Sequence, residues 1–235
     1  MRKTLVCNHK MFLTYDEAEA LEKSISTIQQ SNVDLIICPS YLNMPLFKEY
    51  NLCAQDCFYE DKGPYTGQVS PYQLSLLGVR YVLLGHSEKR EFDTDEIINS
   101  KVKATLRNGM TPILCIGETK TERDLMKTPE VLSKQLKVGL KGVSLSGSEE
   151  IFIAYEPRWV IGGDKCLSKA EIEDTFRYLK KILSQMNISS YKLLYGGAIT
   201  ANNVKNLMSD MVEGYLIGNS SVSFSELYKI IKCIK

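Results

Sequence analysis

Residues 151–163 read IFIAYEPRWVIGG, and the rest of the chain is organised around this stretch. A five-residue apolar run leads directly into Glu156, and Pro157 then ends the strand because proline has no N–H to donate to a neighbouring strand. Gly162 and Gly163 follow, and the access of glycine to positive φ suits a loop that bends or moves. The stretch predicts either a catalytic base beneath a lid or a solvated glutamate before an ordinary loop.

The same strand-then-helix pattern recurs along all 235 residues. Short apolar runs alternate with amphipathic stretches, and the runs lack the strict alternation of a sheet with one face in water. The predicted strands cover residues 5–8, 33–38, 52–55, 81–85, 111–116, 151–155, 191–195 and 214–217. The main predicted helices cover residues 15–30, 95–108 and 120–140, with others beginning at Pro71, after Ser168 and at Asn202, and the last ending at Ile234.

Eight such units favour a closed, parallel (β/α)8 barrel that forms a single domain over residues 1–235. An open doubly wound sheet is the alternative. It is less favoured because no GxGxxG motif follows the first strand.

The composition excludes several classes of function. The chain has 29 Lys and Arg against 28 Asp and Glu, so no overall field draws it to nucleic acid or to an anionic membrane. Its seven cysteines form no CxxC pair, which is typical of reduced, buried thiols rather than of a disulfide or zinc framework. No apolar run reaches 18 residues, and the N-terminus becomes polar too early for a signal peptide. We expect a soluble cytoplasmic protein without metal or cofactor.

Polar residues follow the predicted strands at the mouth where the carboxyl ends of a parallel barrel converge. Asn8 and Lys10 stand two apart, so a period of two places them on one face, with His9 on the other, packed against a helix. A buried ammonium is tolerated where an anionic ligand compensates its charge. A surface lysine at a strand exit is the alternative.

His86 follows the fourth strand and precedes Ser87 and Glu88, where a short helical turn is predicted to begin. The positive end of such a turn disfavours the protonated ring, and a neutral imidazole can give a proton to a carbonyl oxygen and take one back. The alternative is a histidine that only stabilises its loop.

Glycine-rich segments follow the last two strands. Gly196 and Gly197 come after the seventh strand, and Gly218 with Asn219 and two serines comes after the eighth. Backbone N–H groups at such turns bind phosphate in many barrels. Because glycines also mark any tight turn, the prediction rests on these segments together with the glycine pair of the first stretch.

Taken together, these motifs resemble the triosephosphate isomerase family. They are NHK at 8, GHSEKR at 85, CIGE at 115, YEPRWVIGG at 155, YGGA at 195 and GYLIGNSS at 214. The segment AQDCFYEDKGPYTGQVS at 54 is similar to the dimer loop of that family. The match is collinear and spans nearly the whole chain.

The resemblance implies an aldose–ketose isomerase that interconverts dihydroxyacetone phosphate and D-glyceraldehyde 3-phosphate through an enediolate. Glu156 would remove a proton from the substrate carbon, His86 would move protons between the two substrate oxygens, and Lys10 would offset the developing charge. Asn8 would position Lys10, and Glu88 would support these catalytic side chains from nearby. Four backbone amides would hold the phosphate, those of Gly162, Ala198, Gly218 and Asn219. Two side chains would close over the carboxylate and exclude water, Ile161 and Leu216.

Departures from the family pattern leave the substrate open. Ala198 stands where the family has serine, and Asn219 stands where a second glycine is usual. Arg158 and the pair at 163–164, Gly163 and Asp164, alter the lid. The alternative is therefore an isomerase of the same mechanism acting on a four-carbon ketose phosphate (a tetrulose or erythrulose phosphate). A catalytically silent binding barrel is a further alternative, against which the intact catalytic side chains argue.

The resemblance also implies a homodimer. Thr66 in the dimer loop would reach toward Asn8 of the partner subunit and Lys10 of the partner subunit. Gln68 and Lys89 replace an acid and an arginine of the family, and the joint change avoids an unpaired buried charge. We expect the dimer to persist but to be less tightly held.

Overall fold

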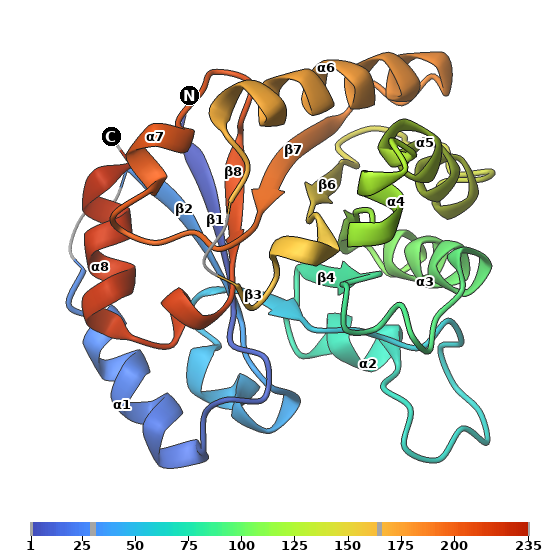
Figure 1. The fold of residues 1–235 in the computed structure, drawn as a ribbon. Helices are drawn as coiled ribbons and strands as arrows, with labels where there is room; N and C mark the ends of the chain where they lie inside the picture. The colour runs from blue at the N-terminus through green and yellow to red at the C-terminus, as the bar shows by residue number, and fades with distance from the viewer. Residues whose placement is uncertain (1, 29–31, 164–165, 235) are drawn as a thin grey trace.

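The structure, a computed structural model, describes residues 2–28, 32–163 and 166–234. Eight parallel strands pair in sequence order, and β1 pairs with β8 to close a barrel (Figure 1). The strands are β1 (Lys3–Asn8), β2 (Val33–Cys38), β3 (Asn51–Ala54), β4 (Tyr81–Leu84), β5 (Thr111–Ile116), β6 (Ile151–Tyr155), β7 (Tyr191–Gly196) and β8 (Gly214–Ile217). The predicted (β/α)8 barrel is confirmed, and the open sheet is excluded.

Helices follow the strands and cover the outside of the barrel (Figure 1). They are α1 (Tyr15–Ile25), α2 (Pro71–Leu76), α3 (Asp95–Arg107), α4 (Lys120–Asp124), α5 (Thr128–Gly139), α6 (Lys169–Gln185), α7 (Val204–Leu207) and α8 (Phe224–Cys233), with 3₁₀ turns η1 (Tyr41–Phe47), η2 (Arg158–Val160) and η3 (Asn219–Ser221). The predicted capping boxes of α1 and α6 are present.

Two helix predictions differ from the structure. The predicted helix over 120–140 is two helices, because Met126 takes a left-handed backbone (φ 56°) and Pro129 lies in the first turn of α5, where its missing N–H costs nothing. The predicted helix over 15–30 ends at Ile25, and Gln30 lies outside the described residues.

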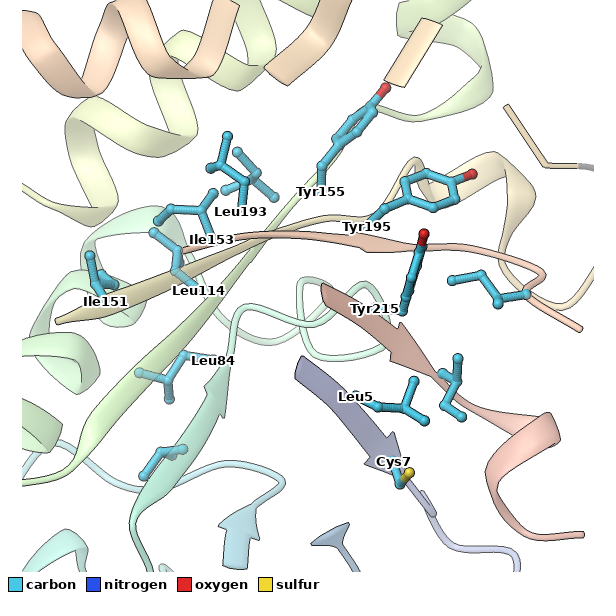
Figure 2. Packing of buried hydrophobic residues seen from close by; sticks show 14 of the residues in the cluster. Leu5, Cys7, Leu84, Leu114, Ile151, Ile153, Tyr155, Leu193, Tyr195 and Tyr215 are labelled. Atoms are coloured by element: carbon cyan, nitrogen blue, oxygen red, sulfur yellow. The ribbon is translucent and has the colours of Figure 1, made fainter. Parts of the chain in front are cut away.

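Buried side chains form two layers, one inside the barrel and one between the strands and the helices. Val6, Phe152 and Leu194 belong to the inner layer, which fills the barrel below its mouth. The outer layer includes Leu5, Leu114, Ile153, Tyr155, Tyr195 and Tyr215 (Figure 2). Because the barrel is filled with apolar side chains, polar chemistry is confined to its two ends.

All seven cysteines are free thiols, and five of them are buried. Burial raises the pKa of the Cys7 and Cys38 thiols well above the usual range. Within the described residues, no helix combines the length and the apolar composition needed to cross a bilayer.

His9 faces the outer layer, as predicted from the period of two. Its ring meets Phe47 of η1 edge-on, with centroids 5.4 Å apart, so the prediction that it packs against a helix is confirmed. The side chain is 2% exposed, and neither ring nitrogen has a hydrogen-bond partner in the part of the chain that the structure describes. Desolvation lowers the pKa of His9 to about 4.

The pKa of His9 generates a prediction about acid stability. The pKa of His9 is lower in the folded state than in the unfolded state, so folding favours the neutral ring. The contribution of the neutral ring to the free energy of unfolding is fully present above pH 6.5 and is lost as the pH falls toward 4. The free energy of unfolding of the wild type, relative to that of His9→Phe, should therefore fall by about 2 to 3 kcal/mol between pH 7.5 and pH 4.5. Urea unfolding of both proteins at the two pH values measures it. An equal fall in the free energy of unfolding of both proteins would contradict the lowered pKa of His9.

Candidate active site

A cavity of about 260 Å³ opens at the carboxyl ends of the strands. The structure brings most of the candidate residues to it: Asn8, Lys10, His86, Glu156, Ile161, Gly162, Ala198, Leu216, Gly218 and Asn219. They come from five segments far apart in the sequence, which lie in or after β1, β4, β6, β7 and β8 of one closed barrel. Two candidates lie outside this lining: Glu88 and Thr66.

Glu156 follows β6, and its backbone N–H donates to the carbonyl of Ile116 (2.8 Å). Its side chain is 4% exposed, and Oε1 lies 3.5 Å from His86 Nε2. The other oxygen, Oε2, has no hydrogen-bond partner among the described residues. A buried carboxylate oxygen normally finds a donor, so this one is available for a ligand.

Two glycines make room for Glu156. A Cβ at Gly196 would lie 2.5 Å from Glu156 Cγ, and a Cβ at Gly117 would lie 1.9 Å from the Glu156 carbonyl oxygen. Both distances are far below van der Waals contact. The pair Gly196 and Gly197 was expected to bind phosphate, but Gly196 serves to seat the carboxylate, and only Gly197 of the two lines the cavity.

His86 follows β4 and is buried. The backbone N–H of Glu88 donates to His86 Nδ1 (3.3 Å), so Nδ1 presents its lone pair and the ring proton of a neutral imidazole is placed on Nε2, which faces Glu156. Lys89 N–H donates to the His86 carbonyl (2.8 Å). The Arg90 N–H also donates to this carbonyl (3.2 Å), so the predicted short helical turn begins at His86, although the segment does not continue as a helix.

Lys10 reaches the cavity by a route that the period of two does not describe. The strand ends at Asn8, and Lys10 adopts a left-handed backbone (φ 49°) that is uncommon for a residue with a side chain. Asn8 Oδ1 accepts from the Lys10 N–H (3.1 Å), and Gln55 Nε2 donates to the Lys10 carbonyl (2.8 Å). Sequence reasoning assigned no role to Gln55, although the quoted dimer-loop segment contains it.

Glu88 is the partner of the Lys10 ammonium. Its carboxylate lies 2.6 Å from Lys10 Nζ, and the glutamate itself is more than half exposed. The Lys10 side chain is mostly buried. Before a ligand binds, the charge of Lys10 is therefore compensated by this carboxylate at the rim of the cavity.

The loop after β6, residues 157–163, is anchored to a buried carboxylate that sequence reasoning missed. Trp159 Nε1 donates to Glu118 Oε1 (3.0 Å), and the Arg158 N–H donates to the Glu118 carbonyl (2.9 Å). Glu118 also accepts from the Tyr155 hydroxyl. The CIGE motif contains Glu118 and was the available signal. Asp164, which follows this loop, lies outside the described residues.

Four candidate phosphate-binding residues share one property. Within the described part of the chain, no protein acceptor takes the backbone N–H of these residues: Gly162, Ala198, Gly218 and Asn219. All four line the same cavity. Unpaired amides that line a cavity are suited to bind an anion. Among the described residues, no group of three His, Cys, Asp or Glu side chains is arranged to hold a metal.

Thr66 lies elsewhere. It is exposed in the loop between β3 and α2, which extends away from the barrel (Figure 1). Thr66 does not line the cavity of its own chain.

The fold and the site define a (β/α)8 barrel enzyme that presents a carboxylate, an imidazole and an ammonium to a small anionic ligand. The sequence profile of the triosephosphate isomerase family matches residues 3–234, and the chain belongs to that family.

Curated relatives agree with this assignment. The chain is 34% identical to the triosephosphate isomerase of Thermoanaerobacter pseudethanolicus, over 98% of this chain and 99% of the relative. It is 36% identical to that of Thermodesulfovibrio yellowstonii, with the same two coverages. It is 34% identical to that of Moorella thermoacetica, over 97% of this chain and 98% of the relative.

The close approach of Gly196 predicts a selective defect. In Gly196→Ala, the new methyl group overlaps Glu156 Cγ, so the carboxylate must move while the amides of the cavity stay in place. We expect kcat to fall at least about 100-fold, the lower range for a displaced general base. The control is Gly139→Ala, where a Cβ would meet Leu114 no closer than 3.4 Å. Unchanged kcat in Gly196→Ala would contradict the packing argument.

Proposed function

We propose that the chain interconverts dihydroxyacetone phosphate and D-glyceraldehyde 3-phosphate. The observation that carries the proposal is the Oε2 atom of buried Glu156, which has no hydrogen-bond partner among residues 2–28, 32–163 and 166–234. It lies beside His86 Nε2 in a cavity also lined by four amides that lack an acceptor in the same residues. The relatives, at 34% to 36% identity, are named for the same isomerisation.

Glu156 acts as the base. Its carboxylate takes a proton from the carbon that bears a hydroxyl beside the carbonyl, and the C–H electron pair moves into the adjacent carbon–carbon bond as the carbonyl oxygen gains charge. His86 donates its Nε2 proton to that oxygen and takes a proton from the neighbouring hydroxyl. Glu156 then returns a proton to the other carbon, so the product is an isomer and no atom is gained or lost.

Lys10 offsets the negative charge of the enediolate and of the phosphate. Its ammonium is already held by Glu88, and the left-handed backbone fixed by Asn8 and Gln55 keeps it at the cavity. A preorganised charge of this kind stabilises the transition state without reorganising during the reaction.

The remaining candidates bind and enclose the substrate. The amides of Gly162, Ala198, Gly218 and Asn219 hold the phosphate, while Ile161 and Leu216 line the cavity and cover Glu156 as the loop after β6 closes. Excluding water strengthens every charge interaction inside the site and protects the enediolate. Arg158 makes no side-chain hydrogen bond or ion pair with the described residues.

The four-carbon alternative has no specific observation in its favour. Ala198 and Asn219 both line the cavity, but the relatives are named for the triose reaction. Measuring kcat/KM on a triose phosphate and a tetrulose phosphate side by side ranks the two substrates.

The base assignment predicts the kinetics of two variants. In Glu156→Asp the shorter side chain withdraws the carboxylate from the substrate carbon, so kcat should fall at least about 100-fold with a much smaller change in KM. Glu156→Gln should be slower still. A coupled assay with glyceraldehyde 3-phosphate measures both, with exposed Glu130→Gln as the control. Equal changes in kcat and KM would count against Glu156 as the base.

We also propose that the chain is a cytoplasmic homodimer. Several exposed apolar side chains belong to segments that follow the first four strands: Met11, Phe12, Leu42, Tyr65 and Phe92. A second cavity of about 330 Å³ adjoins the catalytic one and shares Asn8, Lys10 and His86 with it. We infer that the loop that carries Thr66 enters this cavity in a partner. Seven free thiols support a reducing compartment.

Lys89 forms an ion pair within its own chain. Its ammonium lies 3.0 Å from Asp56 Oδ2, and Asp56 also pairs with buried Lys101. Gln68 is exposed and adds no charge. The charges near the dimer loop are therefore balanced within one chain, which supports a dimer held by loop packing rather than by ion pairs between subunits.

The dimer proposal predicts a position-dependent effect of a new charge. Met11 is 94% exposed in the single chain, and Met126, at the junction of α4 and α5, is 87% exposed. At micromolar concentration, analytical ultracentrifugation should show twice the chain mass for the wild type and for Met126→Glu, and a single-chain mass for Met11→Glu. A monomeric wild type would overturn the proposal.

A further inference from the structure

The segment after β7, residues 197–200, forms one wall of the catalytic cavity. We call it the β7 loop. Its backbone is held by the side chain of Asn203, which is only partly exposed. Asn203 Nδ2 donates to the Ala198 carbonyl (2.7 Å), and Asn203 Oδ1 accepts from the Thr200 N–H (2.9 Å). One amide side chain therefore satisfies a carbonyl and an N–H of the same loop.

Two further hydrogen bonds hold the loop. The Ile199 N–H donates to the Gly197 carbonyl (2.8 Å), and Ser220 Oγ donates to the Ile199 carbonyl (2.6 Å). The Ala198 N–H is left without an acceptor among the described residues. This N–H shares a peptide plane with the Gly197 carbonyl, which accepts from Ile199, and Asn203 holds the carbonyl of the next peptide, so both peptides beside the Ala198 Cα are restrained.

Asn203 also contacts the segment that leads into α6. Its Nδ2 lies 3.8 Å from Cys166 Sγ. The next residue, Leu167, donates its N–H to the Tyr195 hydroxyl (3.1 Å) and so fixes the point where the chain returns to the barrel. The same side chain thus joins the β7 loop to the segment before α6.

We propose that Asn203 is a positioning residue for the substrate phosphate. It holds the β7 loop in the conformation that presents the Ala198 N–H to the phosphate, and its contact with Cys166 links this wall to the segment before α6. Ala198 has no hydroxyl with which to bind or brace this loop, so the side chain of Asn203 supplies that support. The inference rests on the proposed function.

The test compares Asn203→Ala with Asn202→Ala, since Asn202 is exposed in the same turn and makes none of these hydrogen bonds. The readouts are kcat and KM for glyceraldehyde 3-phosphate, and the Kd of sn-glycerol 3-phosphate, which carries the phosphate but cannot isomerise. In Asn203→Ala, KM and Kd should rise about tenfold, the order expected for misaligning one charge-assisted hydrogen bond, while kcat changes by less than about threefold. Asn202→Ala should match the wild type.

The outcomes separate the inference from the proposed function. If the wild type isomerises the triose phosphate and the Kd of Asn203→Ala is unchanged, the positioning role is wrong and the function stands. If the wild type does not isomerise it, the function fails, and the Kd comparison still decides whether Asn203 shapes an anion site. If kcat falls by the same factor by which KM rises, Asn203 has a general structural role. Should Asn203→Ala not fold, Asn203→Ser, which is too short to span both partners, is measured against the same expectations.

Discussion

A carboxylate buried with one oxygen unpaired is the constraint on which the rest of the site depends. The side chain of Glu156 is buried, and its Oε2 has no hydrogen-bond donor among the described residues. Leaving a buried charged group without its full set of hydrogen bonds costs stability, so the surroundings must hold it in place. The close backbone approach at Gly117 and Gly196 does so, because any side chain there would collide with Glu156.

The barrel brings these features together at low cost. Apolar side chains fill its interior, and its parallel strands direct their carboxyl ends to one mouth. Each group in the cavity is then fixed by local contacts. Glu88 N–H sets the His86 tautomer, Asn8 and Gln55 hold Lys10 in a left-handed backbone, and Glu118 anchors Trp159. The chemistry is distributed over the chain, whereas the support for each group comes from its neighbours in space.

Much of this arrangement could be predicted from the sequence. The strands at 33–38, 111–116, 151–155 and 214–217 agree with the structure, since uniform apolar runs bounded by turn residues mark buried parallel strands well. The break between α4 and α5 was missed although Pro129 was an available signal, whereas the left-handed backbone at Met126 has no signal of its own in the sequence. Lys10 lines the expected cavity, but not because of the alternation of a strand. The strand ends at Asn8, and the left-handed backbone of Lys10 directs its side chain there.

The roles of Gln55, Glu118 and Asn203 could not be predicted, because each acts through a contact between residues 5 to 45 positions apart in the chain. A sequence read in order shows residue types and spacing, but it does not show which carbonyl a distant amide will meet. The same holds for Gly196, whose importance comes from the position of Glu156 on the adjacent strand.

The most direct test of the central claim is the fate of the carbon-bound hydrogen during isomerisation in D₂O. If Glu156 carries the proton between the two carbons, part of it exchanges with solvent while it rests on the carboxylate. NMR of the product formed by the wild type should then show deuterium at the carbon that receives the proton. Complete retention of the original hydrogen would indicate a direct shift between the carbons and would contradict a carboxylate base.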